Sequence, residues 1–259
     1  MKRKIFYIFL LCIFLFQINI AYAQNASNEA SVENYQIETN SNSEDNLDLK
    51  KSSVNVYSNA AILMDSKTNT ILYSKNAYEK KYPASTTKIL TAIIAIEKCN
   101  LDDIVTVTKS AISAIPSGYS SAYLSENEQI SVNDLITVFL VHSANDAGYV
   151  LAEHISGSIE NFAELMNQKV KEIGCTNTHF TNPSGIHDEN HYSTAYDLAL
   201  IARYCMQNST FKKIVSQKSC TINSTNKSDV RKYTNTNDLI NPASKYYIEE
   251  CIGIKTGYT

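Results

Sequence analysis

Residues 83–98 read PASTTKILTAIIAIEK, a stretch in which a short polar start leads into an apolar run. The apolar residues that follow Lys88 recur with helical spacing, which predicts a helix over residues 85–98. Pro83 stands just upstream, at a place that a helix start tolerates. Because Ser85 and Lys88 are three residues apart, the helix would place the hydroxyl and the amine on one face.

Ser85 and Lys88 are the candidate nucleophile and general base. A serine hydroxyl attacks poorly until a base takes its proton, and a buried lysine near another cation can lose its own proton near neutral pH. Unpaired N–H groups at the helix start would stabilise a developing oxyanion. The alternative is a helix cap with a solvated lysine. The S-x-x-K spacing also occurs at 209–212 and 224–227, so spacing alone is not specific.

A second polar motif, Ser143-Ala-Asn145, separates two apolar segments with helical pattern, 135–141 and 147–155. Polar residues between buried segments are costly unless they are hydrogen-bonded or functional. We expect Ser143 to relay a proton to a leaving amine and Asn145 to hold a substrate amide. The alternative is an ordinary turn between helices with an N-cap.

The third motif, Lys255-Thr-Gly257, ends a strand-like run and occurs once in the chain. Gly257 would allow a substrate backbone to approach an exposed strand closely. Lys255 and Thr256 would bind a terminal carboxylate, and Lys255 would be the second cation near Lys88. The alternative is a surface strand with a solvated lysine.

Other patterns predict an α+β domain. Two apolar runs at 60–65 and 70–73 predict a hairpin. Helix starts are expected at Ser131, at Ser158 and at Thr194, where Asp197 completes a capping box, and Gly174 is expected to end the second of these helices. Residues 251–255 are expected to be extended again, so that one sheet would join the two ends of the domain.

The N-terminus predicts export. Lys2-Arg-Lys4, an apolar run and Ala21-Tyr-Ala23 form a signal peptide over residues 1–23, in preference to a membrane anchor. Residues 24–52 form a polar, disordered linker, and residues 53–259 form the folded domain. The protein is therefore expected outside the cytoplasm, either secreted or at the outer face of the cytoplasmic membrane. The chain has 23 basic and 26 acidic residues, so it lacks the excess of positive charge that would indicate a nucleic-acid partner.

The cysteines form no evident framework. Cys12 would leave with the signal peptide, and the five that remain are widely scattered with no CxxC spacing. Most are expected to be small buried residues, although one pair could be bridged outside the cell.

Together, the motifs closely resemble those of the low-molecular-weight penicillin-binding proteins that act as serine D-Ala-D-Ala carboxypeptidases. The resemblance covers about residues 60–259. The stretches that carry it are Tyr82-Pro-Ala-Ser-Thr-Thr-Lys88, Ser143-Ala-Asn-Asp-Ala147, Asn182-Pro-Ser-Gly185, His191-Tyr-Ser-Thr-Ala-Tyr-Asp-Leu198, Asn235-Thr-Asn237 and Gly253-Ile-Lys-Thr-Gly-Tyr-Thr259.

This resemblance implies the β-lactamase/transpeptidase-like fold, an antiparallel sheet with a helical cluster, and an acyl-enzyme on Ser85. The substrate would be the peptidoglycan stem peptide, and the oxyanion would be bound by the N–H groups of Ser85 and Tyr258. β-Lactam antibiotics would be covalent inhibitors, and no metal or organic cofactor is expected. Family members continue beyond the K-T-G strand with further strands, a closing helix and often a membrane anchor. We therefore expect the sheet and the domain to be incomplete at the C-terminus, with the anchor not present.

Four rival functions were weighed. A class A β-lactamase needs a glutamate for deacylation, and residues 175–184 contain no carboxylate. A D,D-endopeptidase would use the same catalytic groups and is barely separable by sequence. A zinc site at His187 and His191 is disfavoured because these residues lie in a loop and not on a helix face. A catalytically inactive binding module would follow if the sheet were incomplete.

Overall fold

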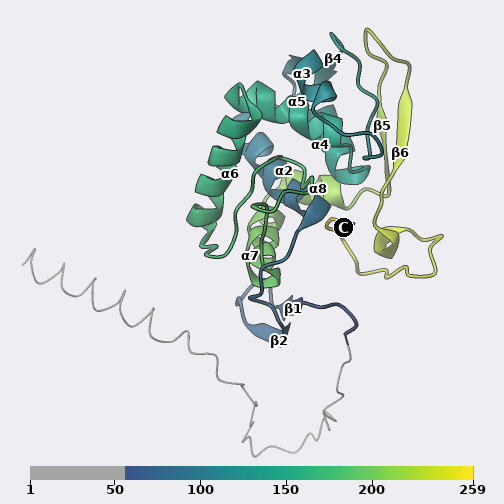
Figure 1. Cartoon of the computed structure of the whole chain (residues 1–259). Coiled ribbons are helices and arrows are strands. Elements are labelled where there is room, and N and C mark those ends of the chain that lie inside the picture. The colour runs from purple at the N-terminus through teal and green to yellow at the C-terminus, as the bar shows by residue number, and fades with distance from the viewer. Residues whose placement is uncertain (1–55, 259) are drawn as a thin grey trace, which may run out of the picture. The chain divides into compact units, whose positions relative to one another are not determined.

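The computed structural model describes residues 56–258 (Figure 1). The expected signal peptide, 1–23, and linker, 24–52, lie outside the described residues. The described part combines a cluster of helices with three small antiparallel sheets, which confirms the expected α+β class.

At the centre of the cluster lies α2 (Lys88–Lys98), which contacts five other helices (Figure 1). These are α4 (Val132–Val141), α5 (Asn145–Ser156), α6 (Ile159–Ile173), α7 (Ala195–Met206) and α8 (Ser209–Val215). All eight residues from Lys88 to Ala95 are buried. A helix that is surrounded on every side needs apolar residues all round, which explains the run ILTAIIA. The polar Lys88 is thereby carried into the interior.

The chain enters α2 through η1 (Ala84–Thr87), a turn of 3-10 helix that contains Ser85. The α-helix itself begins at Lys88, so the prediction of one continuous helix from Ser85 was wrong at its start. Residues 84–87 instead form a tighter 3-10 turn, in which the N–H of Thr86 donates to the carbonyl of Pro83 at 3.2 Å.

The predicted helix caps are present. Ser131, Ser158 and Thr194 each accept a hydrogen bond from a backbone N–H three residues on, at the starts of α4, α6 and α7. Gly174, with φ of 97°, ends α6 as expected. The capping box at Thr194 is only half formed, because the carboxylate of Asp197 binds the N–H of Asn177 and the hydroxyl of Thr178 instead.

Each of the three sheets has two antiparallel strands. The predicted hairpin is confirmed as β1 (Ala61–Met64) paired with β2 (Ile71–Lys75). The second sheet pairs β3 (Ile104–Thr106) with β4 (Gln129–Ser131), and the third pairs β5 (Ser219–Ile222) with β6 (Arg231–Thr234). The short helices α3 (Lys109–Ser113) and η2 (Asp238–Ile240) complete the described elements.

The prediction of a sheet that joins both ends of the domain was wrong for the described residues. Residues 251–258 have no regular secondary structure, and β1 pairs only with β2. An apolar run indicates which residues can be buried, but a strand also needs a partner for its backbone groups. None of the three two-stranded sheets provides that partner to the segment 251–258.

The cysteines that the structure describes are all free, so no pair of them is bridged. Cys175, Cys205 and Cys220 are buried, as expected for small apolar residues, whereas Cys99 and Cys251 are partly exposed. Within residues 56–258, none of the helices combines the length and the hydropathy that a membrane span requires.

Candidate active site

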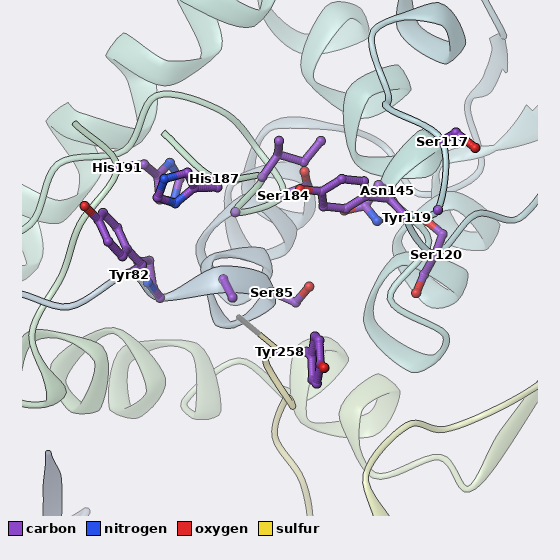
Figure 2. A pocket seen from close by; sticks show the side chains of 15 residues that line it. Tyr82, Ser85, Ser117, Tyr119, Ser120, Asn145, Ser184, His187, His191 and Tyr258 are labelled. Atoms are coloured by element: carbon purple, nitrogen blue, oxygen red, sulfur yellow. Dashed lines mark hydrogen bonds between the residues drawn. The ribbon is translucent and has the colours of Figure 1, made fainter. Parts of the chain in front are cut away.

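A pocket of about 490 Å³ opens around Ser85. Its walls come from residues 82–85, 117–120 and 184–187, together with Asn145, His191 and Tyr258. Figure 2 shows Ser85 in the middle of these walls, with Ser184 and Asn145 on one side and Tyr258 on the other. The site therefore combines segments that are far apart in the sequence.

Lys88 lies directly behind Ser85 and is completely buried. Its Nζ donates hydrogen bonds to Ser85 Oγ at 3.0 Å, to Asn145 Oδ1 at 2.8 Å and to the backbone oxygen of Ser184 at 2.7 Å. Asn145 Oδ1 and the Ser184 carbonyl oxygen can only accept a hydrogen bond, because neither carries a proton. When Lys88 is neutral, its two N–H groups can therefore remain on Asn145 and Ser184 while its lone pair faces the Ser85 hydroxyl. This is the geometry that a general base requires.

The electrostatic surroundings favour that neutral form. Burial, and next the positive charge of Lys255, lower the pKa of Lys88 well below its ordinary value. Burial also lowers the pKa of Lys255 to about 8. The structure thus places beside Lys88 the second cation that the sequence analysis expected.

The backbone before Ser85 is arranged unusually. Ala84 has φ of 47°, and the N–H of Ser85 donates to no other group of the described residues. The same is true of the N–H of Tyr258, which lies in the segment that passes η1. Residues in the left-handed region store strain, and such strain gathers at functional sites.

The segment Lys255–Tyr258 packs against η1. A Cβ on Gly257 would lie 3.2 Å from the carbonyl oxygen of Pro83. Gly257 was expected to allow the approach of a substrate backbone, but in the structure it allows the close approach of the chain before Ser85. Lys255 Nζ donates to the backbone oxygen of Thr256 at 3.0 Å, and the hydroxyl of Thr256 lies 2.7 Å from that of Thr236.

The S-A-N motif lies at the junction between α4 and α5, as predicted. Asn145 faces Lys88, and its Nδ2 donates to the backbone oxygen of Ser120 at 2.8 Å. Its amide is therefore already engaged by the protein on both sides. Ser143 is buried with a left-handed φ of 65°, and within the described residues its hydroxyl makes no hydrogen bond to Ser85 or Lys88.

The family model described as D-alanyl-D-alanine carboxypeptidase matches residues 47–259.

The chain belongs to the D-alanyl-D-alanine carboxypeptidase family.

Individual members of this family show how much of each protein is shared. The chain is 36% identical to D-alanyl-D-alanine carboxypeptidase DacF of Bacillus subtilis over 77% of this chain and 50% of DacF. It is 40% identical to DacA of Haemophilus influenzae over 62% of this chain and 43% of DacA. The chain therefore spans about half the length of these curated relatives.

Solved structures agree with the fold. The Streptomyces K15 DD-transpeptidase superimposes with a TM-score of 0.70 at 31% identity, covering 76% of this chain and 79% of that one. The D-alanyl-D-alanine carboxypeptidase DacD of Francisella tularensis gives a TM-score of 0.73 at 27% identity, covering 86% and 65%. The similarity to these two structures confirms the predicted β-lactamase/transpeptidase-like fold.

Several residues at or near the pocket were not assigned a role from the sequence. Thr236 and Ser184 lie inside stretches that carried the family resemblance, Asn235-Thr-Asn237 and Asn182-Pro-Ser-Gly185, which was the only signal that could have indicated them. Asp146 follows the S-A-N motif, and its buried carboxylate accepts hydrogen bonds from Ser121 Oγ and from the N–H groups of Ala122 and Leu124. It thus holds the loop that forms one wall of the pocket.

Two rival sites find no support in the geometry. No carboxylate is among the residues that line the pocket, so the glutamate of a class A β-lactamase has no counterpart there. His191, considered as a zinc ligand, has both ring nitrogens engaged by protein groups. Nδ1 accepts from the N–H of Thr181 at 3.1 Å, and Nε2 lies 2.8 Å from Thr87 Oγ1.

Proposed function

We propose that this chain is a serine D-Ala-D-Ala carboxypeptidase that removes the terminal D-Ala from peptidoglycan stem pentapeptides. The observation that supports this most directly is the contact of a buried Lys88 Nζ with Ser85 Oγ at 3.0 Å inside an open pocket. The names of the relatives agree with this activity. The chain spans about half of those proteins, and its own residues carry the groups that each step requires.

Acylation begins when Lys88 takes the proton of the Ser85 hydroxyl. Ser85 Oγ bonds to the carbonyl carbon between the two D-Ala residues, and the carbonyl oxygen becomes an oxyanion. The N–H groups of Ser85 and Tyr258, which make no other hydrogen bond in the described residues, are the proposed donors to that oxygen. Because Lys88 becomes charged in this step, its three acceptors stabilise the product of proton transfer.

Collapse of the tetrahedral intermediate breaks the C–N bond, and the proton from Lys88 goes to the leaving D-Ala amine. Ser143 is our candidate for passing that proton, a role that requires its hydroxyl to reach Lys88 once substrate is bound. Water then attacks the acyl-enzyme, with Lys88 again as base. The products are the shortened peptide and regenerated Ser85.

The terminal carboxylate of the substrate would lie against Lys255 and Thr256. Lys255 carries a positive charge below its pKa of about 8, and the hydroxyls of Thr256 and Thr236 lie side by side at 2.7 Å. These groups would select a peptide that ends in a free carboxylate over an internal bond. β-Lactams carry a comparable carboxylate next to a reactive amide, so we expect them to acylate Ser85.

The same substrate implies a location outside the cytoplasm, where peptidoglycan stem peptides are found. Residues 1–23 have the pattern of a cleaved signal peptide. Export is tested by sequencing the N-terminus of protein recovered from outside the cytoplasm, which should begin at Gln24.

Labelling with a fluorescent penicillin tests the proposed chemistry. We expect wild-type protein to be labelled, Ser85→Ala to lose the label, and a control at the pocket wall, Ser117→Ala, to keep it. Folded protein that takes up no label would overturn the acyl-enzyme and leave an inactive binding module. Label that persists in Ser85→Ala would show that another nucleophile reacts.

Defined muropeptides separate carboxypeptidase from endopeptidase activity. Monomeric pentapeptide should yield free D-Ala and tetrapeptide in equal amounts. Cleavage of cross-linked dimers without release of D-Ala from monomers would instead identify a D,D-endopeptidase.

A further inference from the structure

The segment 182–186, Asn-Pro-Ser-Gly-Ile, is here named the base loop because it delivers a backbone carbonyl to Lys88. The carbonyl of Ser184 makes the shortest of the three hydrogen bonds of Lys88 Nζ, at 2.7 Å. Ser184 lies across the pocket from Tyr258, near Asn145 (Figure 2). Whatever fixes this loop therefore also fixes an acceptor of the general base.

The base loop is fixed from inside by one side chain. Asn182 Oδ1 accepts hydrogen bonds from the N–H groups of Ser184 at 3.2 Å, Gly185 at 2.8 Å and Ile186 at 3.1 Å. Its Nδ2 donates to the backbone oxygen of Ile186 at 2.8 Å. Asn182 is buried, so water cannot readily replace these bonds.

The loop is also fixed from outside by α2 and η1. Thr91, one turn after Lys88 on the same face of α2, donates to the carbonyl of Pro183 at 2.7 Å. Lys88 and Thr91 thus bind two consecutive carbonyls of the loop. A Cβ on Gly185 would overlap the carbonyl oxygen of Ala84, so the loop lies directly against the residue before the nucleophile.

We propose that Asn182 is a positioning residue for the general base: it holds the Ser184 carbonyl in place so that the lone pair of neutral Lys88 points at Ser85. This role rests on the proposed acylation of Ser85. Asn182 acts through the loop backbone, since four of its hydrogen bonds go to loop atoms and none goes to Lys88. Its two longer contacts, each of 3.4 Å, join Nδ2 to Thr181 Oγ1 and to His191 Nδ1. The base therefore depends on a side chain that the three family motifs do not contain.

The groups that surround Lys88 determine how the role can be measured. Phe139 of α4 places its ring 5.5 Å from Nζ, and Asn145 of α5 is uncharged. Two titratable neighbours are coupled to Lys88. The charge of Lys255 lowers the pKa of Lys88, and the charge of Lys88 lowers the pKa of His191. A pH profile of acylation alone could mix these groups, so a signal from Lys88 itself is needed.

The experiment combines two measurements on full-length protein. One is the second-order rate constant for acylation by a fluorescent penicillin as a function of pH. The other is the titration of Lys88 by NMR after selective ¹³Cε-lysine labelling, assigned with Lys88→Arg. The second measurement does not depend on activity. If wild-type protein is not acylated, the proposed function fails, while the titration still decides the role of Asn182.

For Asn182→Ala we expect the acylation rate on its high-pH plateau to fall roughly 10- to 100-fold, as for a displaced reacting group. We also expect the Lys88 midpoint to move to lower pH, because the charged amine loses a fixed acceptor. Asn208→Ala is the matched control. It removes the asparagine whose Oδ1 accepts from the N–H of Phe211 at 3.0 Å at the start of α8, outside the pocket, and we expect its acylation rate to stay within about threefold of wild type.

A second variant, Asn182→Asp, is needed because Asn182→Ala could fail to fold. Asn182→Asp keeps an oxygen acceptor for the three N–H groups and adds negative charge, so the Lys88 midpoint should move to higher pH. Midpoints unchanged in both variants would overturn the proposal. So would equal losses of rate in Asn182→Ala and Asn208→Ala, since the loss would then reflect stability and not the position of the loop.

Discussion

Lys88 Nζ donates a hydrogen bond of 3.0 Å to Ser85 Oγ from a position that is completely closed to solvent. The pair belongs to one turn of chain, but the environment that activates it does not. Asn145, Ser184 and Lys255 come from three other parts of the sequence.

Replacing the proposed base, Lys88, should prevent acylation while the protein stays folded. We expect Lys88→Arg to lower the rate of labelling by penicillin about 10²- to 10⁴-fold, because a guanidinium cannot accept the serine proton. Lys98→Arg, at the exposed end of the same helix, should react at the wild-type rate. Labelling of Lys88→Arg at the wild-type rate would show that another group is the base.

The acylation rate should rise with pH as Lys88 loses its proton, with a midpoint well below 10.5 because burial and Lys255 both lower the pKa of Lys88. Removing the Lys255 charge removes a repulsion of protonated Lys88, so Lys255→Met should move this midpoint to higher pH. The exposed Lys218→Met serves as the control and should leave it in place. A shift to lower pH in Lys255→Met would contradict the assigned coupling.

The buried His191 should make the protein acid-sensitive. Burial lowers the pKa of His191 to about 4 from an ordinary 6.5, and its Nδ1 already accepts from an N–H group. The folded state therefore binds fewer protons than the unfolded state between these values, so stability is lost as pH falls from about 6.5 towards 4.

At about 1.36 kcal/mol for each unit, His191 should contribute about 3 kcal/mol to that loss. Urea unfolding at pH 7 and pH 4.5 measures it. The drop between the two pH values should be smaller in His191→Gln than in wild type. In His187→Gln, which changes an exposed histidine of the same loop, the drop should be unchanged.

Gly185 and Gly174 offer a matched test of close packing. Both have a left-handed φ, of 82° and 97°, but a Cβ would overlap Ala84 at Gly185 and meet nothing within 4 Å at Gly174. Gly174→Ala should cost about 1–2 kcal/mol for the conformation alone. Gly185→Ala should cost about 1–3 kcal/mol more through overpacking, and should also slow labelling because it displaces the residue before Ser85. Equal unfolding free energies in the two variants would contradict the packing described for the base loop.

Local features were the most predictable part of the fold. The hairpin at 61–75 and the caps at Ser131, Ser158 and Thr194 are confirmed, because turns and helix ends are specified by neighbouring residues. The strand at 251–255 was wrong, because its backbone partner could not be inferred from apolar content. The α-helix begins at Lys88 and not at Ser85, because residues 84–87 form a 3-10 turn.

The sequence by itself determined the family and indicated the candidate reactive groups, since hydroxyl, amine and glycine are properties of single residues at short spacings. Only the tertiary structure decided their states. It showed that Lys88 is buried beside Lys255, that Asn145 faces Lys88, and that the Ser184 carbonyl completes the environment of the base. A pKa and a lone-pair direction depend on every group within a few ångströms, and those groups come together only when distant segments pack.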